Sequence, residues 1–340
     1  NHPDCNNTLD SFTPTRLINV GQVDSILVRL EAGNRTAGLP YVALSHCWGP
    51  PDPRKPMLVT ETSTLCERLE GIPLDIMPQN FKDAVAFTRQ LNIQYLWIDS
   101  LCIIQDSDKD WQREALLMDQ VYKHAYLTLA ATCARTSHDG FLKRPLSRES
   151  NIECSTWNTR GWTMQERYLS RRLVHCSQYQ AYFECRTAIW PEDNHKVQHM
   201  PTAGRLFDRW FLIAAQFSPR QLTYSRDKLP ALSGLAKETY SAGPVGRYLA
   251  GIWEGDLVYG LLWICWEDDT QFLRPSSYRA PSWTWACLDG QISWGMYWDR
   301  AEMPKMIDLL EVDIELEGDN PFGAIKSGSL VISGSLAAVS

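Results

Sequence analysis

Glu166 is the residue whose position in this sequence most clearly indicates chemistry. It lies in the segment Arg160–Ser170 (RGWTMQERYLS), and a helical reading of this segment sets Glu166 on an apolar face. Trp162, Leu169 and Leu173 share that face. A carboxylate buried there without a partner would have a raised pKa or would cost several kcal/mol. The position therefore predicts either a pocket that uses the carboxylate or an ion pair inside the core.

Buried strands and amphipathic helices alternate along the part of the chain that must position Glu166. Short apolar runs predict strands over Tyr41–Ser45, Tyr95–Ile98, Leu127–Ala131, Leu173–Cys176 and Ala181–Cys185. Helical spacing of apolar residues predicts helices over residues 81–91, 106–125 and 161–171. This order predicts an α/β fold with a mostly parallel sheet between flanking helices. Ligands of such sheets bind outside the carboxyl ends of the strands, where Ser45, Asp99 and the start of the third helix fall.

The pattern of residue types along the chain predicts three parts. Residues 1–40 form a lead-in with short strands over Leu17–Val20 and Ser25–Leu30. Residues 41–195 form the α/β domain. Residues 196–340 form a Trp-rich α+β companion that we expect to pack on it, with helices over Phe207–Phe217 and Asp227–Lys237. In that companion, Trp283 and Trp285 are predicted to share one face of a strand.

Composition narrows the class of partner. The net charge is -7, and Lys and Arg are scattered rather than gathered into a stripe, which argues against nucleic acid or an anionic membrane and favours a small polar ligand. The longest apolar stretch, Leu257–Trp266, is too short to span a bilayer. We therefore expect a soluble, cytoplasmic protein. The chain begins without Met and ends inside an alternating apolar stretch, so we expect a fragment or a processed form.

Cysteine and histidine usage argues against a disulfide scaffold and against zinc. The ten cysteines include no C-x-x-C pair and the seven histidines no zinc spacing, which predicts reduced thiols and no metal site. Cys47 and Cys102 lie near strand ends, but His46 would point away from Cys47 on a strand, so both are interpreted as buried thiols. The absence of the phosphate-loop, dinucleotide-loop and G-x-S-x-G motifs weakens the NTPase, dehydrogenase and α/β-hydrolase interpretations.

Three blocks of sequence together resemble a known family. They are YVALSHCWG over residues 41–49, YLWIDSLCI over residues 95–103 with Asp110, Trp111 and Glu114 behind it, and RGWTMQER over residues 160–167. In order, spacing and content they closely resemble the HET (heterokaryon incompatibility) domain family over roughly residues 41–190. The later segments DKLP (227–230), YLAGIW (248–253) and APSWTW (280–285) look like the region that often follows this domain. The resemblance implies a fungal intracellular protein of non-self recognition and programmed cell death.

HET domains are in turn remotely similar to TIR domains, which have a flavodoxin-like fold and include NAD-cleaving members. The catalytic Glu of those members lies in a W-C-x-x-E helix, and Trp162-Thr-Met-Gln-Glu166 has the same spacing, with Thr163 in place of Cys. The resemblance implies NAD as a substrate rather than a bound cofactor, with Glu166 as the catalytic carboxylate. It also implies assembly through self-association or a partner protein.

A carboxylate suits this chemistry. Loss of nicotinamide from ribose passes through an oxocarbenium-like centre, which a carboxylate stabilises by opposing the positive charge and bonding the ribose hydroxyls. The residues expected to bind the nucleotide are Ser45, Trp48, Asp99, Arg160, Trp162 and Gln165.

Structural alternatives stay open for each of these residues. Glu166 could instead pair with an arginine of the same segment, namely Arg160, Arg167 or Arg171. Asp99 could cap a turn, Trp48 could fill the core, and Glu114 is expected to close its helix onto the sheet through an Arg or a backbone donor. At the level of function, the alternatives are a non-catalytic signalling module that self-associates and an enzyme for another small molecule.

Overall fold

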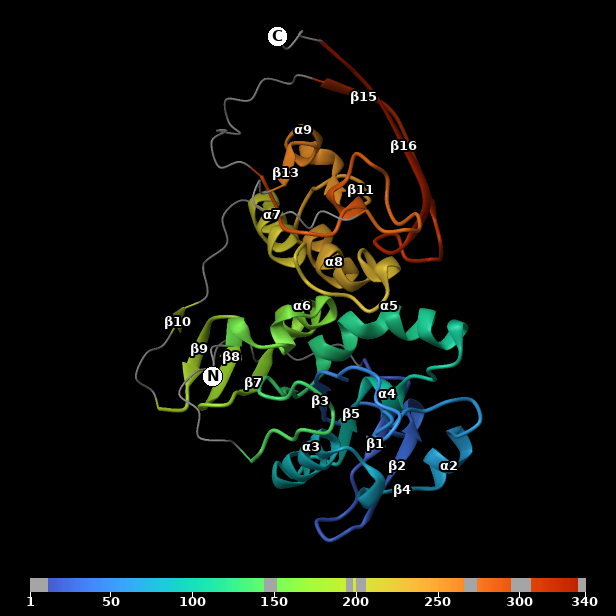
Figure 1. Ribbon diagram of the computed structural model, residues 1–340, viewed down its shortest axis with the longest axis vertical. Coiled ribbons are helices and arrows are strands. Elements are labelled where there is room, and N and C mark those ends of the chain that lie inside the picture. Colours follow the sequence, from blue (N-terminus) through green and yellow to red (C-terminus); the bar gives the residue numbers. More distant parts are fainter. Residues whose placement is uncertain are drawn as a thin grey trace. The chain divides into compact units, whose positions relative to one another are not determined.

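The computed structural model describes residues 12–143, 152–193, 198–199, 206–265, 274–294 and 307–335. The chain divides into two compact units, Asn1–Pro201 and Thr202–Ser340 (Figure 1). The strands and helices predicted around Glu166 all belong to the first unit.

The first unit is built on a mixed sheet of ten strands in the order β10-β9-β8-β7-β6-β3-β5-β1-β2-β4. The strands are β1 (Arg16–Asn19), β2 (Leu27–Ala32), β3 (Tyr41–Ser45), β4 (Ile72–Pro73), β5 (Tyr95–Trp97), β6 (Leu127–Ala130), β7 (Arg172–Cys176), β8 (Ala181–Cys185), β9 (Ala188–Pro191) and β10 (Gln198–His199). The pairs β5–β3, β3–β6 and β6–β7 are parallel. The remaining pairs are antiparallel, including both pairs formed by the N-terminal strand β1.

Helices cover this sheet on both faces. They are α2 (Leu65–Glu70), α3 (Gln79–Gln90), α4 (Asp99–Cys102), α5 (Asp108–His124) and α6 (Gly161–Leu169), with short 3-10 helices η1 (Gly33–Arg35), η2 (Leu74–Ile76), η3 (Ile152–Cys154) and η4 (Trp157–Thr159). Helices α5 and α6 lie against each other on one face, and α3 lies on the other (Figure 1). Because both faces are covered, all five residues of β3 are buried, as the unbroken apolar run predicts.

The predicted α/β class is confirmed, but the prediction of a mostly parallel sheet is wrong. Only Ser177–Gln180 separates β7 from β8. A link this short can make a hairpin but not the crossover that a parallel neighbour needs, so the predicted fifth strand runs antiparallel. Leu173 likewise lies on β7 and not on the helical face of Glu166, because α6 ends at Leu169 and Ser170 is extended.

The second unit combines helices, small two-stranded sheets and an aromatic core. Its elements are α7 (Leu206–Phe217), η5 (Ser225–Asp227), η6 (Pro230–Leu232), α8 (Ser233–Ala242), β11 (Tyr248–Leu249), β12 (Ile252–Trp253), η7 (Glu254–Asp256), α9 (Leu257–Gly260), β13 (Trp263–Cys265), η8 (Trp285–Cys287), β14 (Ile292–Trp294), β15 (Ile307–Leu316) and β16 (Ile325–Gly334). Trp210 and Trp285 both donate their indole N–H to the carbonyl of Gly251 at 2.9 Å. Gly251 has a φ of +108°, which glycine adopts without strain.

Two predictions for this unit need correction. The helix predicted over Asp227–Lys237 is two 3-10 turns followed by α8, because Pro230 cannot donate the backbone bond that a continuous helix requires. Trp283 and Trp285 do not share a strand face, since Thr284 caps the 3-10 turn that begins at Trp285. The predicted helix Phe207–Phe217 is confirmed as α7.

Candidate functional site

The site lies where the parallel strands of the first unit end. Ser45 is the last residue of β3, and Asp99 opens α4 directly behind β5. Glu166 comes from α6, the helix that precedes β7 in the chain. Carboxyl ends of parallel strands meet at one edge of a sheet, which is why residues 121 positions apart in the chain come into contact here.

Glu166 is a buried carboxyl group held by a hydroxyl. Its residue is only 7% exposed, and its Oε2 accepts a short hydrogen bond from the Ser45 hydroxyl. Burial raises the pKa of Glu166 from its ordinary value of 4.5 to about 7, against the lowering effects of the Ser45 bond and the Arg160 charge. At neutral pH the group therefore exists in both protonation states, as a general acid or base requires.

A second carboxylate, Asp99, stays ionised beside Glu166. Its two oxygens contact His46 Nε2 at 3.3 Å and the indole N–H of Trp48 at 2.8 Å. Burial opposes ionisation, but the His46 and Trp48 bonds outweigh it and lower the pKa of Asp99 below 3.8. The negative charge of Asp99 in turn contributes to the raised pKa of Glu166. The two carboxyl groups thus have opposite shifts, the pattern that assigns different roles to neighbouring acids.

Arg160 joins the two carboxylates. It is the N-cap residue of α6, and its guanidinium donates a short hydrogen bond to the backbone carbonyl of His46. Its charge lowers the pKa of both Asp99 and Glu166. The structure therefore brings five of the predicted residues into one network: Ser45, Trp48, Asp99, Arg160 and Glu166.

The other two predicted nucleotide-binding residues have different surroundings. Trp162 is partly buried, and its ring meets Trp111 edge to face at 6.4 Å between centroids. Gln165 is completely buried on α6. Seven of the nine residues of α6 are buried, so this helix lacks the broad exposed face that an amphipathic surface helix has. The helical spacing predicted one buried face and underestimated how deeply α6 is enclosed.

Three residues of the site were not predicted from the sequence. His46 bonds Asp99, Trp157 donates its indole N–H to Ser45 Oγ at 2.6 Å, and the buried Tyr122 lies against Glu166. Burial first, and then the charge of Glu166 and a hydrogen bond with it, raise the pKa of Tyr122 well above its ordinary value. A signal for His46 was its place between Ser45 and Trp48, but no spacing rule indicated Trp157 or Tyr122.

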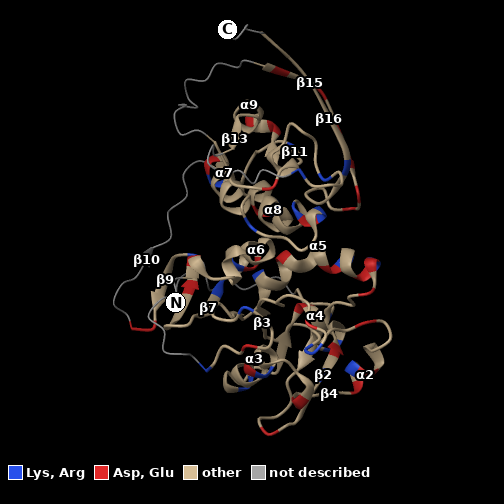
Figure 2. Cartoon of the chain, viewed as in Figure 1, with Lys and Arg blue, Asp and Glu red and all other residues tan. Residues whose placement is uncertain are grey.

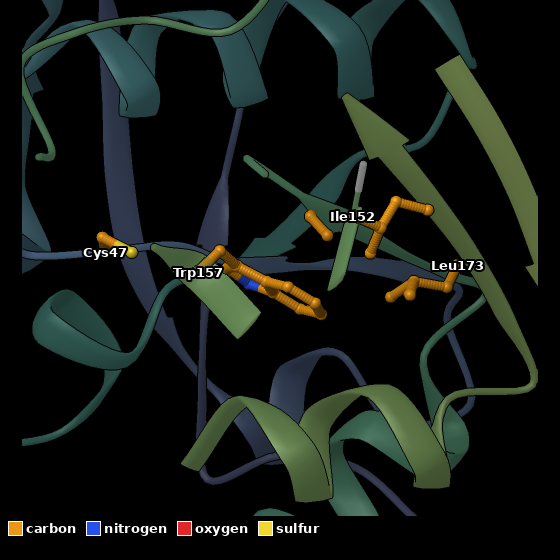
Figure 3. Close-up of a cluster of buried hydrophobic side chains, with 5 residues drawn as sticks. Cys47, Ile152, Trp157 and Leu173 are labelled. Atoms are coloured by element: carbon orange, nitrogen blue, oxygen red, sulfur yellow. The ribbon is translucent and has the colours of Figure 1, made fainter. Parts of the chain in front are cut away.

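Trp157 fills the space above the sheet beside the site. Figure 3 shows its ring between Cys47 on one side and Ile152 and Leu173 on the other. The indole is completely buried and meets His175 edge to face at 5.4 Å between centroids. Trp157 thus has the core-filling role that was considered for Trp48, which is itself partly exposed.

Of the arginines considered as ion-pair partners for Glu166, Arg167 is engaged elsewhere. Its Nε lies 3.0 Å from Glu184 and its Nη1 2.9 Å from Glu153, so Arg167 forms its ion pairs with these two glutamates. Glu114 has the structural setting that the sequence predicted. It lies 3.6 Å from Arg16, and burial raises its pKa.

The thiols beside the site are buried. Cys47 and Cys102 are buried, as predicted, and burial raises the pKa of Cys47 and brings that of Cys102 to about 12. A thiol with a raised pKa is a poor nucleophile. Within the described ranges, no three His, Cys, Asp or Glu side chains are grouped so that they could hold a metal ion.

Charge and hydropathy of the described residues agree with the composition. Acidic and basic residues are both scattered over the elements of each unit (Figure 2). None of the described helices is both long and apolar enough to cross a bilayer.

Fold and site together define an α/β domain with a buried carboxyl group of near-neutral pKa at the carboxyl ends of its parallel strands. Residues 41–153 match the family model described as Heterokaryon incompatibility protein (HET), so the chain carries a HET domain, whose family is associated with heterokaryon incompatibility. Ser45, Trp48 and Asp99 fall inside the matched stretch, whereas Glu166 and the rest of α6 follow it. Comparisons with curated proteins and with solved structures gave no match.

Proposed function

We propose that the HET domain of this chain binds a nicotinamide dinucleotide and hydrolyses its N-glycosidic bond, with Glu166 as the catalytic carboxylate. The observation that carries the proposal is the near-neutral pKa of a carboxyl group buried at the carboxyl ends of parallel strands. In chain order, the parallel strands β5-β3-β6-β7 run second, first, third and fourth. This order is the one expected for the first four strands of a flavodoxin-like sheet and so supports the proposal, because the nucleotide site of that fold lies between the first and third strands, here β3 and β6.

The remaining residues of the network are proposed to bind and orient the nucleotide. In its ionised form Glu166 would accept a hydrogen bond from a ribose hydroxyl of the substrate in addition to the bond from Ser45. Asp99 and Arg160 would set the electrostatic field around the ribose and phosphates, and Trp48 offers an indole for stacking. Trp162 and Gln165 belong to the same helix as Glu166 and are proposed to contact the nucleotide as well.

The proposed reaction needs no strong acid. The C1′–N bond breaks, its electron pair neutralises the pyridinium nitrogen, and nicotinamide leaves. The cation at C1′ is stabilised by the Glu166 carboxylate and captured by water, whose proton passes to Glu166 and then to solvent. The products are nicotinamide, ADP-ribose and one proton.

A non-catalytic, self-associating signalling module is the second candidate. The enclosure of the site favours it, since Glu166 already has Ser45 as a partner and Trp157 is completely buried. Another small-molecule reaction in the same site is a third candidate.

The experiment that separates these candidates measures nicotinamide release from NAD over a series of protein concentrations. The purified chain is compared with Glu166→Gln and with the exposed control Glu61→Gln, all matched for folding by thermal melting. We expect Glu166→Gln to lose roughly a hundredfold or more of the rate, the usual cost of removing an acid–base group, and Glu61→Gln to keep it. If none of the three proteins releases nicotinamide, even at concentrations where the chain assembles, the proposal is contradicted and the signalling module is favoured.

A further inference from the structure

Trp157 occupies a defined place above the sheet. The register puts Ser45 of β3, Ala130 of β6 and His175 of β7 side by side in one row, and residues of one row share a face. Trp157 spans this row. It packs on Ala130, its Nε1 lies 2.6 Å from Ser45 Oγ, and its ring meets His175 edge to face. The small Ala130 side chain leaves room for the indole to bridge the two outer strands.

The bond from Trp157 fixes what the Ser45 hydroxyl can do. A serine hydroxyl has one proton to donate and lone pairs that accept. Because the Ser45 oxygen accepts the indole N–H, its proton is left for Glu166 Oε2, the acceptor on its other side. When Glu166 is ionised, the indole, the hydroxyl and the carboxylate thus form one chain of hydrogen bonds in which the indole donates to the hydroxyl and the hydroxyl donates to the carboxylate.

The backbone of Trp157 is anchored to the helix that carries Glu166. The hydroxyl of Thr163, on α6, donates to the backbone carbonyl of Trp157 at 2.8 Å. On the far side, the His175 ring that contacts Trp157 is held by Glu184 at 2.8 Å. Trp157 is therefore tied by its backbone to α6, and its ring lies against a held side chain of β7.

We infer that Trp157 is a positioning residue for Glu166 that acts through the Ser45 hydroxyl. A hydrogen bond donated to an ionised carboxylate stabilises the ionised form, so the directed Ser45 proton favours ionised Glu166. Without the indole N–H, the Ser45 hydroxyl is free to turn to other acceptors, and Glu166 becomes harder to ionise. The inference rests on the proposed function only in assigning catalysis to Glu166. The hydrogen bonds that link Trp157, Ser45 and Glu166 do not depend on that function.

The test follows the titration of Glu166 by NMR on protein labelled with carbon-13 at the glutamate carboxyl groups. Glu166→Gln identifies the signal by its loss. We expect Trp157→Phe, which keeps a ring but lacks the N–H, to raise the midpoint by about one pH unit, the size of a typical local perturbation. The control Trp253→Phe changes a buried indole of the second unit and is expected to leave the midpoint unchanged.

The same titration in a Ser45→Ala background tests the route. There, Trp157→Phe is expected to add no further shift, because the intermediate hydroxyl is gone. If Trp157→Phe does not fold, benzothienylalanine at position 157 replaces the N–H by sulfur at nearly the same volume. An unchanged midpoint, or an equal shift in the Ser45→Ala background, would overturn the inference. A shift in a protein that does not cleave NAD would leave the inference intact and contradict only the proposed function.

Discussion

The two units each bury an ionisable group, and the two groups are held in different ways. In the second unit, Lys228 donates to the carbonyl of Ser218 at 2.9 Å, lies 3.6 Å from Asp289, and faces the rings of Phe217 and Trp285. Burial lowers the pKa of Lys228 to about 8. Fixed groups from several segments thus surround this charge, which is what a structural role requires.

In the first unit, Glu166 is shifted toward neutrality as well, but its partners differ. The hydrogen-bonding partners of Glu166 are uncharged hydroxyl groups, those of Ser45 and Tyr122, and the site is at the edge of a sheet where ligands of this fold class bind. Burial of a charge therefore does not by itself indicate function. The comparison indicates that uncharged hydrogen-bonding partners and position in the fold do.

The largest expected effect concerns a third buried charge, Glu184, whose setting is structural like that of Lys228. Arg167 lies 3.0 Å from Glu184, and His175 lies 2.8 Å from it. Arg167→Met would remove the guanidinium and leave a buried carboxylate with one neutral partner, so we expect a loss of about 4 kcal/mol in the free energy of unfolding. Urea denaturation at pH 7 measures it. A double variant that adds Glu184→Gln to Arg167→Met is expected to recover most of the lost stability. A loss below about 1 kcal/mol in Arg167→Met alone would mean that the Glu184–Arg167 ion pair has no structural role.

The next effect is the pH dependence that Glu166 imposes on stability. Between pH 4.5 and about 7 the unfolded chain loses the proton that folded Glu166 keeps, so the free energy of unfolding falls as the pH rises through this window. The fall is about 3 kcal/mol. Glu166→Gln removes it, so relative to the wild type the variant is expected to gain about that amount from pH 4.5 to pH 7.5. Parallel stability curves for the two proteins would contradict the raised pKa.

Lys228 predicts the opposite slope in a different window. Between about pH 8 and pH 10.5 folded Lys228 loses a proton that the unfolded chain keeps, so the free energy of unfolding rises with pH, again by about 3 kcal/mol. Lys228→Met is expected to flatten this rise, whereas Lys237→Met, at an exposed position of α8, leaves it in place. Denaturation curves across this range measure it. A wild-type rise that survives in Lys228→Met would assign it to another group.

The smallest expected effect is a loss of stability on substitution of Gly49, which follows Trp48 in the chain. Gly49 has a φ of +86°, and a Cβ there would lie 2.7 Å from Thr136. Gly49→Ala is expected to cost about 2 kcal/mol through strain and the clash together. Gly38 has a φ of +73° and open space around it, so Gly38→Ala is expected to cost only about 1 kcal/mol, the part due to φ. Equal losses in thermal or urea denaturation would mean that Thr136 moves aside.

The sequence predicted those parts of the fold that local patterns encode. Apolar runs located the four parallel strands, and helical spacing located α3, α5 and α6. The mostly parallel sheet was wrong because strands outside the alternation of strands and helices, such as β1 and β8, join the sheet by antiparallel pairing. The extent of the second-unit helices was wrong where Pro230 interrupts the pattern.

The candidate site likewise contains residues that local patterns predicted and residues that they did not. Ser45 and Asp99 were located because they end strands, and Glu166 because it interrupts an apolar face. Trp157 comes from the short 3-10 helix η4, and Tyr122 comes from the last turn of α5. Their contacts with Ser45 and Glu166 arise only when the sheet assembles, so no spacing along the chain predicts them.

The most direct test of the central claim, that Glu166 is buried to act on a ligand, is proton release on nucleotide binding at pH 7. Calorimetric titration with a carbocyclic NAD analogue, whose C–N bond is not cleaved, in buffers of different ionisation enthalpy counts the protons. With a pKa of about 7, Glu166 is half protonated, and the pyridinium charge would drive it to the ionised form, so we predict release of about half a proton per nucleotide bound. Glu166→Gln should release none. Binding without proton release in the wild type, or with equal release in the variant, would contradict the account.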